Sequence, residues 1–189
     1  MHSKFSLIAT ASTSFILLTA IFSVVFAQGK GVPNPCDLFT KAEAEMMFRE
    51  TVSDGQTGKT VMPTANTCKY SFKKNGAAYG VTIKIATSDA LRQEGFYSSA
   101  KDLFTRQKKA RMSSEDTAKK MKVIQGLGDD AFWNGYDLWI VRGDYFVNIV
   151  SNSFLGGSFK NTEAMQKARY EQDLEFSRKV AEKVIQKIR

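Results

Sequence analysis

Asp129 and Asp130 are the two residues that could most readily serve as an acid and a base. Neighbouring residues of a strand point to opposite faces of a sheet, so these two carboxylates would not reach the same substrate atom. The only histidine is His2, and no imidazole follows it for a triad, a proton shuttle or a zinc site. We therefore expect no catalytic residues, no metal site and no cofactor, with a histidine-independent hydrolase as the alternative.

Trp139 is the residue best suited to holding a small ligand. In the strand register derived below, Asp130 and Asn148 flank it on the two neighbouring strands. An aromatic platform with two polar neighbours is typical of a small-molecule site. The alternative is an ordinary core tryptophan whose ring nitrogen is satisfied by a nearby oxygen.

Residues 53–60, SDGQTGKT, resemble the end of a phosphate-binding loop at Gly58-Lys59-Thr60. That motif needs a glycine at position 53, where this chain has Ser53, and it needs a strand before it and a helix after it. Here a helix is expected before it and Pro63 follows it. We expect a flexible turn at this place.

Basic residues are concentrated between Lys101 and Lys122, where eight lysines and arginines stand against three acids. Lys108, Lys109 and Arg111 are the candidates for contact with an anionic surface. The alternative is a solvated helix face without a binding role. No signature of a nucleic-acid-binding fold accompanies these charges, so the expected partner is an anionic envelope component or another envelope protein, and not nucleic acid.

The N-terminal 27 residues have the composition of a secretory signal, with Lys4 before an apolar stretch and Val25-Phe26-Ala27 as a cleavage site. The alternative is an uncleaved anchor, because residues 5–27 carry no charge. We expect cleavage after Ala27 and a periplasmic or secreted protein. Because the leader holds Lys4 and no acid, removing it lowers the net charge from +8 to +7 and leaves residues 28–189 as a single domain.

Cys36 and Cys68 are the only cysteines. An even number of cysteines in an exported chain predicts a disulfide between them. Closing a loop of this size would contribute about 3 to 4 kcal/mol to the free energy of unfolding.

A block of three strands between Gly126 and Ser151 is the expected centre of the fold. Turns at Asn134-Gly135 and Gly143-Asp144 would join the strands, and a two-residue first turn would pair Trp133 with Tyr136. Apolar side chains then occupy both faces of the sheet, and we expect other elements to pack on both faces. One face would hold Ala131, Trp133, Tyr136, Leu138, Ile140, Tyr145, Val147 and Ile149, and the other Phe132, Trp139, Val141, Phe146 and Val150.

The remaining elements follow from capping and alternation. Thr40 and Glu43 form a capping box before a helix that ends near Arg49. Residues 68–72 and 78–86 are a predicted hairpin, residues 122–124 a short strand, and residues 88–112 a long helix weakened at Gly95. Asn161 can cap a final helix whose apolar stripe packs across the sheet.

Three landmarks carry a resemblance to a known family: CDLFTKAEAEMMF, then Cys68-Lys69-Tyr70, then GLGDDAFW. Together they resemble small secreted or lipid-anchored bacterial domains of unknown function, whose fold is similar to the PsbP-like α/β sandwich. This sequence departs from them in having no lipid-bearing cysteine, and in having Phe48-Arg49 where a glycine often ends the first helix. The resemblance implies a fold and an envelope location, and it transfers no catalytic residue.

These observations predict an α+β fold in which an antiparallel sheet is packed by helices. The expected function is an exported, non-catalytic binding or accessory module of the cell envelope. A histidine-independent hydrolase or a small-ligand-binding protein is the alternative.

Overall fold

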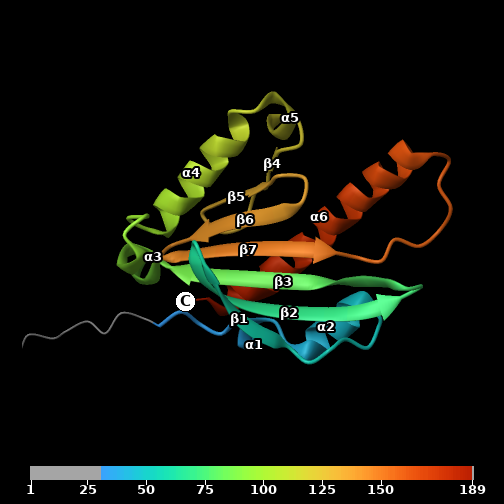
Figure 1. The fold of residues 1–189 in the computed structure, drawn as a ribbon, viewed down its shortest axis with the longest axis horizontal. Coiled ribbons are helices and arrows are strands. Elements are labelled where there is room, and N and C mark those ends of the chain that lie inside the picture. Colours follow the sequence, from blue (N-terminus) through green and yellow to red (C-terminus); the bar gives the residue numbers. More distant parts are fainter. Residues whose placement is uncertain (1–30, 189) are drawn as a thin grey trace, which may run out of the picture.

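Residues 31–188, the part of the chain that the computed structural model describes, fold around one antiparallel sheet (Figure 1). Its seven strands lie in the order β1-β2-β3-β7-β6-β5-β4. The strands are β1 (Gln56–Val61), β2 (Thr64–Lys74), β3 (Ala77–Thr87), β4 (Lys122–Val123), β5 (Asp130–Trp133), β6 (Asp137–Arg142) and β7 (Tyr145–Asn152). The predicted antiparallel sheet packed by helices is confirmed.

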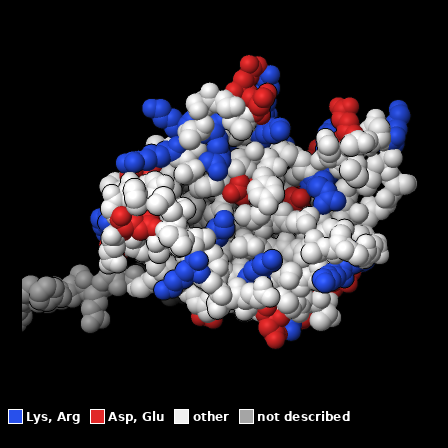
Figure 2. Space-filling model, in the orientation of Figure 1, with Lys and Arg blue, Asp and Glu red and all other residues white. Residues whose placement is uncertain are grey.

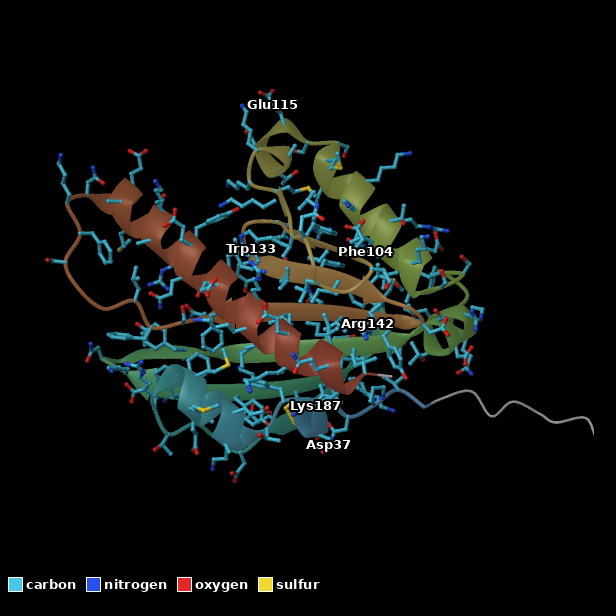
Figure 3. All side chains as sticks on the ribbon, turned by 180° about the vertical axis from the view of Figure 1, so that it is seen from behind. Asp37, Phe104, Glu115, Trp133, Arg142 and Lys187 are labelled. Carbon is cyan, nitrogen blue, oxygen red and sulfur yellow. A yellow bond between two sulfur atoms is a disulfide. The ribbon has the colours of Figure 1, made fainter. Side chains whose placement is uncertain are left out.

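Six helices accompany the sheet in this part of the chain. They are α1 (Pro35–Leu38), α2 (Lys41–Phe48), α3 (Ser88–Glu94), α4 (Ala100–Met112), α5 (Glu115–Ala118) and α6 (Thr162–Lys187). Helices α1, α2 and α6 lie on one face of the sheet, as the view from behind shows (Figure 3). Helices α3 and α4 lie on the other face, at one side only; α3 contacts one end of β2 and β3, and the rest of these two strands has no helix over it (Figure 1).

The alternation of side chains along each strand separates two apolar cores. The core beneath α6 contains Ile83, Ile85, Leu138, Ile140, Val147 and Ile149, together with Val180, Ala181 and Val184 of the helix. The core beneath α4 contains Leu103 and Phe104 of the helix and Phe132, Trp139, Val141 and Phe146 of the strands. The expected division of the strands between two faces is confirmed except at Tyr136, which is exposed.

The register of the first predicted hairpin was wrong by two residues. Trp133 pairs with Leu138, and not with Tyr136. The cause is Asn134, whose side-chain oxygen accepts hydrogen bonds from the amides of Tyr136 at 2.9 Å and Asp137 at 2.8 Å and stabilises a longer loop. A shift of two residues keeps every side chain on its face, so the core assignment was unaffected.

The predicted helix over residues 88–112 is two helices. Helix α3 ends at Gly95, which adopts a left-handed conformation with φ of 81°, and α4 begins five residues later at Ala100. Ser99 caps α4 by accepting a hydrogen bond from the amide of Asp102. The break leaves the side chain of Phe96 exposed to solvent.

The turn expected at residues 53–60 was also wrong, because residues from Gln56 onward form the edge strand β1. Each of its residues pairs with β2, and Gly58 lies opposite Thr67. Lys59 and Thr60 therefore belong to a strand and have no phosphate-binding loop around them. Edge strands can be polar on both sides, which removes the alternation that would have revealed this one.

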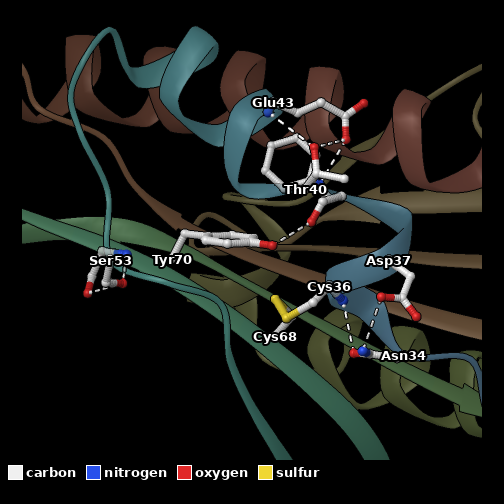
Figure 4. The surroundings of a disulfide bond; sticks show 10 residues. Asn34, Cys36, Asp37, Thr40, Glu43, Ser53, Cys68 and Tyr70 are labelled. Carbon is white, nitrogen blue, oxygen red and sulfur yellow. Dashed lines mark hydrogen bonds between the residues drawn. A yellow bond between two sulfur atoms is a disulfide. The ribbon is translucent and has the colours of Figure 1, made fainter.

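The N-terminal part of the described chain is held against β2 by the predicted disulfide (Figure 4). Cys36 and Cys68 are bonded, with their Cα atoms 5.2 Å apart. Nearby, the buried hydroxyl of Tyr70 donates to the carbonyl of Phe39 at 2.9 Å. The capping box of Thr40 and Glu43 is confirmed at the start of α2. The signal sequence and its cleavage site lie outside the described residues.

Candidate functional site

Trp139 is buried, with 8% of its surface exposed. Its ring stacks on Phe132 at a centroid distance of 5.8 Å and packs against Phe146 at 5.3 Å. The guanidinium of Arg111 lies 4.3 Å from the ring centroid, over its face. Trp139 is therefore part of the core beneath α4, with Arg111 covering the face that a ligand would use.

Asp130 does not lie beside Trp139. It pairs across the strands with Val141, because of the two-residue shift in register. Its carboxylate accepts hydrogen bonds from Lys108 at 2.7 and 3.0 Å. Asp130 therefore joins β5 to α4 and contributes nothing to a platform around Trp139.

Asn148 does lie opposite Trp139 on β7, as predicted. Its side-chain amide donates to the carboxylate of Asp137 at 2.9 Å, and Asn134 donates to the other oxygen of that carboxylate. Asn148 and Asp137 are both buried. Asp137 was not among the predicted site residues, although it lies two residues from Trp139 on β6 and alternation along the strand places it on the same face.

The three basic residues of α4 have different surroundings. Lys108 forms the ion pair with Asp130, and Arg111 covers Trp139 while donating to the side chain of Gln107 at 2.6 Å. Lys109 is exposed and forms no ion pair with any described carboxylate. The structure therefore does not bring Lys108, Lys109 and Arg111 together as one free cationic cluster.

A second basic surface lies on the uncovered side of the sheet. We call it the open face and define it by Lys69 and Lys73 of β2 and Lys84 of β3. The neighbours of these lysines along each strand point into the core beneath α6, so the lysines themselves point away from it. None of the three forms an ion pair with a described carboxylate. Figure 2 shows basic side chains spread over these strands.

Beyond the open face, the same side of the sheet runs into the core beneath α4. Strand pairing places Thr67, Lys84, Asn148 and Trp139 in one row across β2, β3, β7 and β6. Arg111 stands at the end of this row, above the tryptophan ring. Asn148 and Trp139 are buried, so the open face includes only the part of this row that lies on β2 and β3.

The sequence contained a signal for this surface that charge counting along the chain missed. Strands β1, β2, β3 and β7 contain no aspartate or glutamate, although five lysines lie among them. One of these, Lys74, pairs with Glu50 behind the sheet. Since the five lysines are distributed over three strands, they do not form a long basic run in the sequence, and the prediction was drawn from the basic run in α4 instead.

The carboxylates that a hydrolase would use have structural partners. The side chain of Asp129 accepts a hydrogen bond from the amide of Gly143 at 2.7 Å and so holds the turn between β6 and β7. Asp173 of α6 is buried and accepts from the amide and hydroxyl of Ser153 at 2.8 and 2.6 Å. These contacts tie loops and strands together.

In residues 31–188, no helix has the length and apolar content to cross a bilayer. Within the same residues, no group of three or more histidine, cysteine, aspartate or glutamate side chains is arranged to hold a metal ion. Comparison with protein-family models, with curated proteins and with solved structures finds no match to this chain.

Proposed function

We propose that this protein is an exported, non-catalytic binding module of the cell envelope that docks onto an anionic component through the open face. The observation that carries the proposal is a set of three lysines, Lys69, Lys73 and Lys84, that form no ion pair with a carboxylate of residues 31–188 and lie on strands that contain no acid. A broad basic surface suits an extended partner, such as an anionic polymer or a layer of lipid headgroups.

The disulfide supports the envelope location, because such bonds persist in oxidising compartments. A periplasmic or secreted location, reached through the N-terminal leader, is part of the proposal. So is a relationship to the PsbP-like sandwich domains, for which the antiparallel sheet packed by helices gives general support.

The proposal is tested with vesicles that contain a third of an anionic phospholipid, using protein purified after export. Mass spectrometry first establishes whether residues 1–27 are present, because a retained apolar leader would bind vesicles of any charge. Each lysine near an anionic surface contributes about 1 kcal/mol, so Lys69→Gln, Lys73→Gln and Lys84→Gln together should weaken binding about a hundredfold. Binding by the parent protein should also fall steeply as salt is raised from 50 to 300 mM.

The matched control replaces three other exposed lysines, Lys101, Lys109 and Lys160, by glutamine. This variant has the same net charge as the open-face variant, and we expect it to keep most of the affinity. Equal losses in the two variants would show that only total charge matters, and the open face would then have no special role. A larger loss in the control would move the docking surface to the outer side of α4.

A further inference from the structure

A groove lies between the N-terminal half of α6 and the loop that joins β5 to β6, and none of the three open-face lysines lines it. Its volume is about 670 Å³. We call it the tyrosine groove after Tyr136 and Tyr170, which line it together with Lys120, Lys167 and Arg169. Asn152, Gln166 and Glu163 contribute polar side chains to the same lining.

Tyr136 is presented to solvent by a well-defined loop. Its side chain is 68% exposed, although its aromatic character predicted a core position. The loop is held by the two hydrogen bonds from the amides of Tyr136 and Asp137 to Asn134. A flat, exposed ring on a restrained backbone loses little conformational entropy when a ligand covers it.

Tyr170 is fixed on the opposite wall of the groove. Its hydroxyl donates to the carbonyl of Lys120 at 2.9 Å, and burial raises the pKa of this phenol, which keeps the proton in place. Its ring meets Trp133 edge to face at 5.9 Å (Figure 3 labels Trp133). The nitrogen of Lys122 lies 4.8 Å from the ring centroid.

Gly135 allows the two walls to come close. Its φ is 98°, and a Cβ atom there would lie 3.2 Å from Cβ of Lys120 and 3.7 Å from the Tyr170 ring. A larger residue would be strained by the positive φ and would crowd Lys120, whereas its contact with the Tyr170 ring would be an ordinary one. Glycine at this position therefore lets the β5–β6 loop lie against Lys120.

The charge of the groove is positive. Lys120, Lys122, Lys167 and Arg169 form no ion pair with the described carboxylates. Arg169 donates one hydrogen bond, to the side chain of Asn152 at 3.0 Å, and keeps further donors. Of the acids in the lining, Asp173 is buried and already bonded to Ser153, so Glu163 alone opposes the three cations of the lining, Lys120, Lys167 and Arg169.

We infer that the tyrosine groove binds an acidic saccharide, with a sugar ring packed on Tyr136 and its carboxylate bound by the surrounding lysines and Arg169. Aromatic rings suit the apolar face of a pyranose, and charge-assisted hydrogen bonds suit its carboxylate. Asn152 and Gln166 supply amides that hydrogen-bond hydroxyl groups. This site is separate from the open face and does not depend on the function proposed for that face.

The test is isothermal titration calorimetry of the exported protein with a trisaccharide of galacturonic acid, with the neutral galactose trisaccharide, and with inorganic phosphate. We expect the acidic sugar to bind at least about tenfold more tightly than either of the other two probes, because only it offers both a ring and a carboxylate. No binding of the acidic sugar, or equal binding of the neutral one, would overturn the inference.

Two variants locate the site. Tyr136→Ala should weaken the acidic sugar about tenfold by removing the packing surface, and Lys167→Gln should weaken it several-fold and reduce its salt dependence. The matched controls are Phe96→Ala, an exposed aromatic at 57%, and Lys101→Gln, and both should leave affinity unchanged. If Tyr136→Ala binds normally while retaining its circular dichroism spectrum, the ring does not pack on this tyrosine and the inference is wrong.

The open-face variant of Lys69, Lys73 and Lys84 separates the two proposals. It should bind the acidic sugar as the parent protein does, even though its binding to anionic vesicles is lost. Loss of sugar binding in that variant, with normal binding in Tyr136→Ala, would assign the saccharide to the open face and overturn the tyrosine groove.

Discussion

Trp139 is a residue type that often binds small ligands, but its position in the structure gives it a role in the core. Its ring lies between Phe132 and Phe146, and Arg111 covers it. Its ring nitrogen is buried and has no hydrogen-bond partner among the described residues, which the alternative of an ordinary core tryptophan had not anticipated. The packing of the ring, and not a hydrogen bond, therefore holds it in place.

We predict that Trp139→Ala lowers the free energy of unfolding by about 3 to 5 kcal/mol, because it opens a cavity beneath α4. Trp139→Phe should cost less than half of that, since it keeps an aromatic ring in the core. Urea denaturation followed by circular dichroism measures both. A stable Trp139→Ala variant that has lost affinity for a small ligand would instead favour the ligand-binding role.

Glu43 links the start of α2 to the end of α6. Burial alone would raise the pKa of Glu43, but hydrogen bonds from Thr40 and Lys187 outweigh it, and the pKa lies below its usual value. Its carboxylate accepts from the Thr40 amide at 2.8 Å and from Lys187 at 3.1 Å. A lowered pKa means that the charged form stabilises the folded state.

This stabilisation is complete above the unfolded-state pKa of about 4.3 and is lost as pH falls through the lower folded-state value. We predict that Glu43→Gln lowers the free energy of unfolding at pH 7 by about 1 kcal/mol, as for loss of a helix cap. In urea titrations below pH 5, the free energy of unfolding of this variant should also fall less steeply with decreasing pH than that of the parent protein. Glu171→Gln, at an exposed position on α6, should leave that decline unchanged. A decline in Glu43→Gln as steep as the parent's would contradict this role.

At the scale of elements, the disulfide joins α1 to β2. The two cysteines are 32 residues apart in the sequence. We predict that replacing both Cys36 and Cys68 by alanine lowers the free energy of unfolding by about 3 to 4 kcal/mol, through the larger conformational freedom of the unfolded chain. The folded sheet should keep its circular dichroism spectrum. A loss below 1 kcal/mol would mean that the contacts of α1 hold this segment without the bond.

The sequence predicted elements well where local chemistry decided them. The capping box at Thr40, the turn at Asn75-Gly76 and the two-faced strands around Leu138 all follow from neighbouring residues. The edge strand β1 was missed because an edge needs no apolar alternation. The break at Gly95 was underestimated, since helix propensity alone does not show that Leu103 and Phe104 must turn back onto the sheet.

The candidate site was less predictable because its residues meet across long separations. Pairing of β6 with β7 was enough to place Asn148 beside Trp139. The position of Arg111 over Trp139 depends on how α4 crosses the sheet, and no local pattern encodes that. The exposure of Tyr136 depends on hydrogen bonds to one asparagine that lengthen a loop by two residues.

At the scale of the whole molecule, cover is unequal on the two faces of the sheet. Three helices lie behind it, whereas α3 and α4 cover only one side of the front (Figures 1 and 3). The uncovered strands are basic and lack acids, and the tyrosine groove lies beyond them at the N-terminal half of α6. The fold therefore has a broad basic surface, the open face, and a separate groove, the tyrosine groove.

Lysine acetylation footprinting on anionic vesicles tests the docking surface most directly, because it reads each lysine separately in one protein. Reactivity with and without vesicles is compared by peptide mass spectrometry. We predict that Lys69, Lys73 and Lys84 become several-fold less reactive on vesicles, while Lys101, Lys109 and Lys160 do not change. Protection of Lys101 and Lys109 with Lys69, Lys73 and Lys84 still reactive would contradict docking through the open face.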